Sequence, residues 1–171
     1  MSNFIINPYM VLPSTTEYCN GITLDRNYWV ANTSRNVLAT KILEDHPAIG
    51  NTVTSVSMWL TGKNASSTDT FTFGIWNSGG TKVATSASIN VKDIADNGDP
   101  STVKYTYDVT ERVLAVNDYI GIEQTSTNYD MEFGADEGGS PAYEQSWNRD
   151  SASSWSLFDL GNVGFGYCIS G

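Results

Sequence analysis

The sequence predicts an all-β protein, folded as an antiparallel β-sandwich of about nine or ten strands. Three observations support this fold class. Apolar and polar residues alternate with a period of two in segment after segment, turns rich in Gly and Asn separate these segments, and no segment has a convincing helical period. Strands without crossover helices favour antiparallel sheets packed face to face, as in a jelly roll or a related sandwich.

The strands follow one another closely along the chain. In one of the clearest, Val56, Met58 and Leu60 occupy every second position, which indicates a strand with one buried face. Turn residues at 77–80 and 96–100 allow the chain to reverse between strands, and residues 91–95 could form at most one helical turn. In chain order, strands are expected at residues 28–32, 37–42, 55–60, 71–76, 82–90, 103–109, 119–124, 129–133 and 163–169.

The chain length of 171 residues suits one domain with a sizeable core. Residues 1–27 contain Pro8 and Pro13 and alternate little, so we expect an extended N-terminal arm there and the sandwich at 28–171. Residues 134–154 contain runs of Gly and Ser and form the longest irregular region. Loops at the ends of a sandwich often carry function.

The charge of the chain limits its partners. Nine Lys and Arg against 19 Asp and Glu give a net charge of -10 without a basic stripe. Nucleic acid and anionic membrane surfaces would both be repelled, so neither is an expected partner. No apolar stretch is long enough to span a bilayer, and the first residues lack the basic start and apolar core of a secretion signal. We therefore expect that the protein acts without being secreted by means of such a signal.

The two cysteines, Cys19 and Cys168, lie near opposite ends of the sequence. The first and last strands of a sandwich can be neighbours, so the two thiols could form a disulfide. A bridge closing so long a loop would stabilise the fold by roughly 5 kcal/mol in the chain-entropy model. Two separate buried thiols remain the alternative.

Catalytic signatures are nearly absent, and we expect a protein that is not an enzyme. The single histidine, His46, lies in a turn-like segment without a nucleophile motif around it, which indicates a surface loop histidine rather than a catalytic base or a ligand with Glu44 and Asp45. Asp130 and Glu132 are two residues apart on an expected strand and could form a glycosidase-like carboxylate pair. A solvated acidic strand face is the simpler interpretation.

No cofactor is expected, with calcium as the one metal to consider. Hard cations prefer several oxygen ligands, which loops of a sandwich often supply. The candidate ligands are Asp130, Asp136 and Glu137, with a second acidic group at residues 93–99 that does not match the spacing of a known calcium loop.

Four of the five tryptophans are candidates for binding. Trp59 and Trp76 face away from the apolar residues of their own strands, and Trp147 and Trp155 flank an irregular segment. Exposed aromatic side chains stack on sugar rings or anchor protein interfaces. The alternative is that these faces are buried beneath other parts of the chain.

The segments 53–60, 71–85 and 118–123 together resemble jelly-roll modules with carbohydrate-binding-module-like folds. Such modules occur in surface proteins of microbes and in structural proteins of tailed viruses, including capsid decorations and fibres. The similarity covers about residues 50–125, where the matching positions are scaffold positions, so no binding residue carries over.

The resemblance implies a virion surface structural protein, a capsid decoration (cement) protein or a fibre subunit, that acts by assembly on a larger lattice. Its expected partners are capsid or other virion proteins and further copies of itself, and its expected location is the virion surface. The alternative is a carbohydrate-binding module or a cell-surface adhesion protein with a glycan partner, located outside the cell or on its surface.

Overall fold

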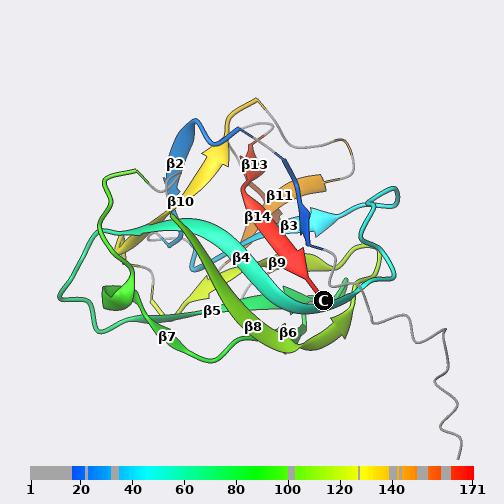
Figure 1. Cartoon of the computed structure of the whole chain (residues 1–171), viewed down its shortest axis with the longest axis horizontal. Coiled ribbons are helices and arrows are strands. Elements are labelled where there is room, and N and C mark those ends of the chain that lie inside the picture. The colour runs from blue at the N-terminus through cyan, green and yellow to red at the C-terminus, as the bar shows by residue number, and fades with distance from the viewer. Residues whose placement is uncertain are drawn as a thin grey trace, which may run out of the picture.

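A computed structural model shows two antiparallel β-sheets packed face to face, which confirms the predicted sandwich (Figure 1). The structure describes residues 17–21, 23–31, 35–99, 103–126, 128–138, 142, 144–149, 154–158 and 163–171. None of these residues forms a helix of the length and hydrophobicity that crossing a membrane requires. The short 3-10 turn η1 (Val91–Asp93) occupies the segment for which one helical turn was expected.

The first sheet has seven strands: β1 (Tyr18–Cys19), β2 (Arg26–Trp29), β4 (Thr52–Gly62), β8 (Lys104–Val113), β10 (Met131–Asp136), β13 (Gly164–Phe165) and β14 (Tyr167–Ser170). The second sheet also has seven: β3 (Val37–Ile42), β5 (Thr70–Trp76), β6 (Lys82–Thr85), β7 (Ile89–Asn90), β9 (Tyr119–Gln124), β11 (Glu144–Arg149) and β12 (Ser156–Leu157).

The described residues therefore form fourteen strands instead of nine or ten. All nine expected segments contain a strand, but two of them are each divided into two, as β6 with β7 and as β13 with β14. The remaining strands, β1, β11 and β12, were not predicted.

Strand β4 organises the first sheet. It pairs with β8 along one edge and with β14 and β10 along the other. Strand β1 pairs with β14, so the first and the last strand of the described chain lie side by side (Figure 1). Residues 17–21 and 23–27 of the expected arm thus belong to the sandwich or lead directly into it, whereas residues 1–16 and 22 lie outside the described residues.

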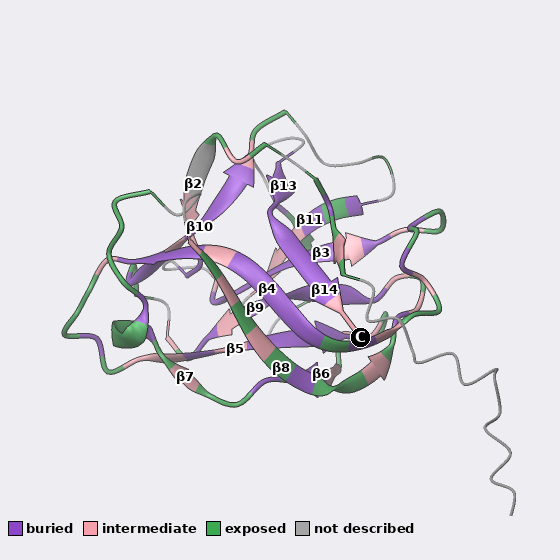
Figure 2. Ribbon diagram, in the orientation of Figure 1, coloured by how far each residue is buried: buried purple, intermediate pink, exposed green. Residues whose placement is uncertain are grey.

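Strand β9 lies in the middle of the second sheet, between β3 and β5, and β11 pairs with the far edge of β3. The inward-facing residues of both sheets form one apolar core, in which Phe71, Phe73, Phe133, Phe165 and Tyr167 are the largest fully buried rings besides Trp76. Figure 2 shows this core as the buried stretches of β4, β10 and β14, while β8 alternates between exposed and less exposed residues. The side chains that point outward from the second sheet do not belong to this core.

Candidate functional site

Aromatic side chains gather on the outer face of the second sheet. Trp76, Tyr119 and Trp147 point outward from β5, β9 and β11: the first two alternate with residues of the apolar core, and Trp147 alternates with the buried polar residues of β11. Trp155, just before β12, lies over them: its ring stacks on Tyr119 with centroids 4.3 Å apart and meets Trp76 edge to face at 5.8 Å. We call these four residues the aromatic face.

The register of the sheet explains why these rings meet. Trp76 is directly opposite Tyr119 across β5 and β9, whereas Trp147 is opposite the small residue Ala39, whose other neighbour is Gly121. A Cβ atom at Gly121 would lie 2.0 Å from the carbonyl oxygen of Leu38, so the close approach of β3 and β9 requires glycine there. Small residues in the central strands thus leave room for the surrounding rings.

Three cations border the aromatic face. The Arg149 guanidinium carbon lies 4.6 Å from the centroid of the Trp155 ring, the Lys82 Nζ lies 4.9 Å from the Trp76 ring, and the Lys41 Nζ lies 5.2 Å from the Trp147 ring. These are distances of cation–π contacts. Burial lowers the pKa of Arg149 and raises the pKa of Tyr119, as expected for groups that the stacked rings shield from water.

Several donors on this face lack an acceptor. The indole N–H groups of Trp147 and Trp155 and the Nε of Arg149 are buried without a hydrogen-bond partner among the described residues. Buried polar groups in native proteins are nearly always hydrogen-bonded, so three unpartnered donors on one face need an explanation. Because these atoms are closed to solvent, a ligand that accepts hydrogen bonds can reach them only when the neighbouring side chains move.

A groove of about 380 Å³ lies beside the aromatic face, along β5 and β9 of the second sheet. Its volume lies within the range of small-ligand sites. Lys82 joins the two regions, because its Nζ contacts Trp76 and also forms a 2.6 Å ion pair with Glu123 in the groove wall. The lining is mostly polar and includes Asn36, Thr70, Thr72, Glu123, Gln124 and Thr125.

Gln124 lines this groove, but its side chain is fully buried. Its Nε2 donates to Asp69 Oδ2 at 3.3 Å and to the carbonyl oxygen of Asn128 at 3.2 Å, whereas its Oε1 is buried without a partner. Partial burial disfavours the charged form of Asp69, but hydrogen bonds from Ser126, Asn128 and Gln124 outweigh it and lower the pKa of that carboxyl. Asp69 therefore stays charged and holds the Gln124 amide in one orientation.

The sequence-based expectation for His46 was wrong. His46 is buried and not a surface loop residue: its Nε2 lies 3.2 Å from Glu144 Oε1 and 2.9 Å from Tyr167 Oη, and its Nδ1 accepts a 3.1 Å hydrogen bond from the Ala48 N–H. The neighbouring Glu44 and Asp45 are exposed and take no part in this network. The His46 partner Glu144 lies on β11, a strand that was not predicted.

The suggested calcium ligands are not brought together. Asp130 precedes β10 and Asp136 ends it, so the strand rise separates them by roughly 20 Å. The Asp130 carboxylate already accepts hydrogen bonds from Asn64 at 2.9 Å and Ser67 at 2.6 Å, and Glu137 accepts one from Tyr28 at 2.9 Å. The residues proposed from the sequence therefore do not form one ligand set.

The carboxylate pair proposed for hydrolysis is also divided between structural contacts. Asp130 is buried in its bonds to Asn64 and Ser67, while Glu132 is half-buried and lies 3.4 Å from Lys63 Nζ. Each carboxylate thus has its own structural partner.

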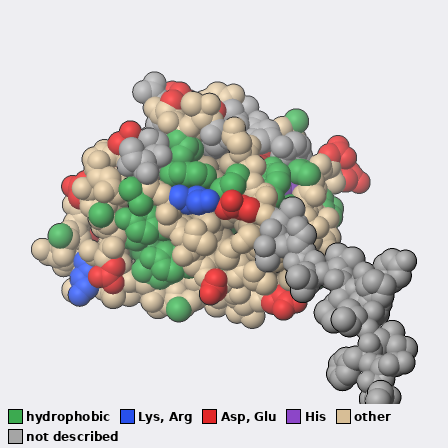
Figure 3. Space-filling model, viewed as in Figure 1, with side chains coloured by type: hydrophobic (Ala, Val, Ile, Leu, Met, Phe, Trp, Pro, Cys, Tyr) green, Lys and Arg blue, Asp and Glu red, His purple; other side chains and the backbone are tan. Residues whose placement is uncertain are grey.

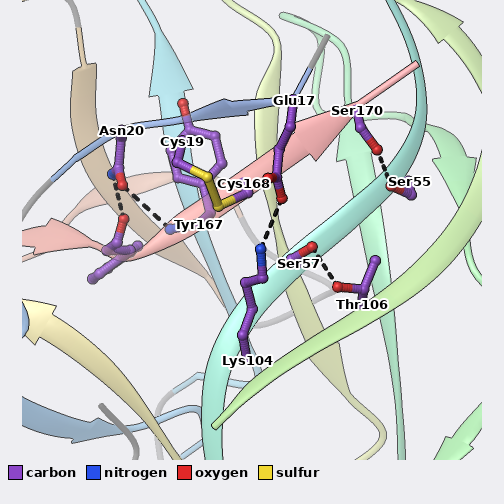
Figure 4. The surroundings of a disulfide bond; sticks show 11 residues. Glu17, Cys19, Asn20, Ser55, Ser57, Lys104, Thr106, Tyr167, Cys168 and Ser170 are labelled. Carbon is purple, nitrogen blue, oxygen red and sulfur yellow. Dashed lines mark hydrogen bonds and ion pairs between the residues drawn. A yellow bond between two sulfur atoms is a disulfide. The ribbon is translucent and has the colours of Figure 1, made fainter. Parts of the chain in front are cut away.

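Cys19 and Cys168 form a disulfide, the first of the two alternatives that the sequence left open. They are directly opposite each other in the β1–β14 pair, on the outer face of the first sheet (Figure 4). Among the described residues, Glu17 and these two cysteines are the one group with metal-ligand proximity. Because both sulfur atoms are bonded to each other, we do not assign a metal to this group.

The four candidate tryptophans occupy opposite faces of the sandwich. Trp76, Trp147 and Trp155 share the aromatic face, with Trp76 fully buried and the other two half-buried. Trp59 lies on the outer face of the first sheet, where a Cβ atom at Gly166 would lie 3.2 Å from its ring and the Lys104 Nζ lies 5.8 Å from the ring centroid. The site also contains Tyr119, Arg149 and Gln124, which sequence reasoning did not identify.

No protein-family model matches the sequence, and a search of curated proteins finds no match either. The fold and the site together define the chain as an antiparallel β-sandwich with an aromatic and cationic outer face on its second sheet.

Proposed function

We propose that this chain is a non-enzymatic surface protein that binds carbohydrate through the aromatic face and the adjoining groove. The observation that carries the proposal is the pair of half-buried indole rings of Trp147 and Trp155, bordered by the cations of Lys41 and Arg149 and placed beside a polar groove. Sugars combine apolar ring faces, which stack on indoles, with hydroxyl groups that both accept and donate hydrogen bonds.

The groove supplies the complementary polar groups. The side-chain hydroxyl groups of Thr72 and Thr125 lie in its wall and can form hydrogen bonds with sugar hydroxyls. A few oriented polar groups beside aromatic rings are typical of sites that bind small polar ligands with defined orientation. This chemistry favours the glycan partner among the alternatives that the sequence left open.

Replacing Trp147 or Trp155 by alanine should weaken glycan binding at least about tenfold, which corresponds to about 1.4 kcal/mol. The loss is expected because Trp147 is a half-buried ring on which a sugar can stack, and Trp155 holds Tyr119 and Arg149 in place beside it. The measurement is binding of the wild type and both variants to a broad glycan array, followed by calorimetry on the strongest ligand.

Trp59→Ala is the matched control, since it removes the same side chain from the opposite face. It should leave glycan binding unchanged. Wild-type protein that binds no glycan, or variants of Trp147 and Trp155 that bind as well as the wild type, would count against the proposed function.

A second candidate is supported by the outer face of the first sheet. In this second candidate function, the chain is a virion surface protein that assembles on a larger lattice. It is then a decoration or fibre subunit related to jelly-roll modules. Figure 3 shows this side of the molecule covered mainly by uncharged side chains and backbone, although the chain has a net charge of -10. Depletion of charge is typical of the core of protein interfaces.

The hydroxyl groups on this face bond to each other. Ser55 pairs with Ser170 at 2.6 Å and Ser57 with Thr106 at 2.7 Å, around the disulfide (Figure 4). A face of small side chains whose hydroxyls are already satisfied can be covered by another subunit at low desolvation cost. The disulfide is consistent with a virion or cell surface, where such bonds persist.

Thr106→Arg should reduce self-association of the protein by at least about tenfold, because it places an unpaired charge in the middle of the proposed contact. Sedimentation velocity of the wild type and the variant measures this effect. Thr85→Arg on β6 of the second sheet is the control and should associate like the wild type. A wild-type protein that stays monomeric at every accessible concentration speaks against self-assembly.

A further inference from the structure

Arg149 is held in place by rings rather than by an acid. Its guanidinium carbon lies 4.6 Å from the Trp155 ring centroid and 5.9 Å from that of Trp76. A Cβ atom at Gly80 would lie 3.2 Å from Arg149 Nη1, and Gly80 has a φ of +80°, so both the backbone conformation and the space favour glycine beside the guanidinium. These contacts place the guanidinium beside the rings of Trp155 and Trp76.

The guanidinium has no acceptor of its own. Among the described residues, its side chain takes part in no hydrogen bond or ion pair, and its Nε is buried without a partner. The carboxylate of Glu123 acts on it only at a distance, because Glu123 is bonded to Lys82 at 2.6 Å. Only Nε is among the buried unpartnered atoms, so the Nη groups remain open to the oxygens of water or of a ligand.

A second cation without a counterion lies on the same face. Lys41 Nζ contacts the Trp147 ring at 5.2 Å and the Tyr119 ring at 5.8 Å, and within the described part of the chain it forms no ion pair. Trp147 and Arg149 are two residues apart on β11, which places them about 6.5–7 Å apart along the strand. One sugar residue stacked on Trp147 could therefore reach Arg149 with a substituent.

We propose that the ligand of this face is an anionic glycan whose carboxylate or sulfate group is bound by Arg149. The inference rests on the proposed carbohydrate-binding function and specifies its ligand class. The planar guanidinium donates two parallel hydrogen bonds to such a group, and the stacked rings keep it oriented for that contact. Lys41 adds a second positive charge beside the same aromatic surface.

The test compares matched charged and neutral polymers. Polygalacturonate and its fully methyl-esterified form differ in the carboxylate, and dextran sulfate and dextran differ in the sulfate, so the two arms distinguish the two anions. The wild type should bind the charged member of at least one pair ten times or more as tightly as the neutral member. Arg149→Gln should lower the affinity for that charged polymer by about 10- to 100-fold, and the affinity for the neutral polymer by several-fold less.

Lys92→Gln is the control for net charge, since Lys92 is an exposed cation on η1 and its loss changes the total charge equally. It should bind like the wild type. Arg149→Lys keeps the charge but not the paired donors, and should still lose several-fold in affinity. It tests the same contact if Arg149→Gln lowers the melting temperature.

Equal binding of the charged and neutral polymers, or equal losses in Arg149→Gln and Lys92→Gln, would overturn the anionic-ligand inference and leave glycan binding intact. Absence of binding to all four polymers and to a glycan array would instead overturn the proposed function, and this inference with it.

Discussion

Removing the disulfide by Cys19→Ala together with Cys168→Ala should lower the free energy of unfolding by about 5 kcal/mol, because the bridge closes a loop with a sequence separation of 149 residues. For a chain of this size, that loss corresponds to a decrease of about 10–20 °C in melting temperature. Denaturant unfolding and calorimetry of the oxidised wild type and the double variant measure it.

Reduced wild-type protein is the control, since it lacks the bridge but keeps both side chains. Its stability should match that of the double variant. If oxidised and reduced wild type unfold at the same temperature, the bond between the terminal strands does not have the stabilising role assigned to it.

Replacing Glu144 by leucine should destabilise the fold by about 3–5 kcal/mol. Glu144 is buried, and its carboxyl oxygens accept hydrogen bonds from Tyr18 and Asn20 at 3.2 Å and from Tyr167 at 2.9 Å, with His46 Nε2 also at 3.2 Å. The leucine would leave these buried donors without their common acceptor, which costs more than the apolar contacts return.

Glu111→Leu is the matched control, because Glu111 is exposed on β8 and the same change there should alter stability by less than about 0.5 kcal/mol. Denaturant midpoints of both variants provide the comparison. Equal effects of the two substitutions would show that the Glu144 network does not contribute to stability as described.

The alternation of apolar residues was sufficient to predict the sandwich and nine of its strand positions. It failed for β11, because the inward-facing residues of that strand are Glu144 and Ser146, while its outward residue Trp147 is the aromatic one. A strand that turns polar groups into the protein reverses the usual alternation of apolar and polar residues. The sequence pattern therefore predicted a loop for this segment. The environment of His46 was missed for the same reason.

The candidate site was only partly predictable. The outward position of Trp76 was available from the sequence, but that of Trp147 was not, and the stacking of Trp155 on Tyr119 depends on contacts between segments distant in the chain. Arg149 gave no signal of its own, since one arginine in an irregular-looking segment is usually a solvated surface residue. The absence of a counterion becomes visible only when the neighbours of the guanidinium are known.

Carbohydrate binding by the aromatic face is tested most directly by titrating isotope-labelled protein with the best ligand from the glycan array and following the amide and indole N–H resonances. The account predicts that the largest shifts occur at the indole N–H groups of Trp147 and Trp155, which are buried without partners in the free protein, and at backbone amides of β9 and β11. Shifts confined to the first sheet around Trp59, with both indole resonances unchanged, would contradict it.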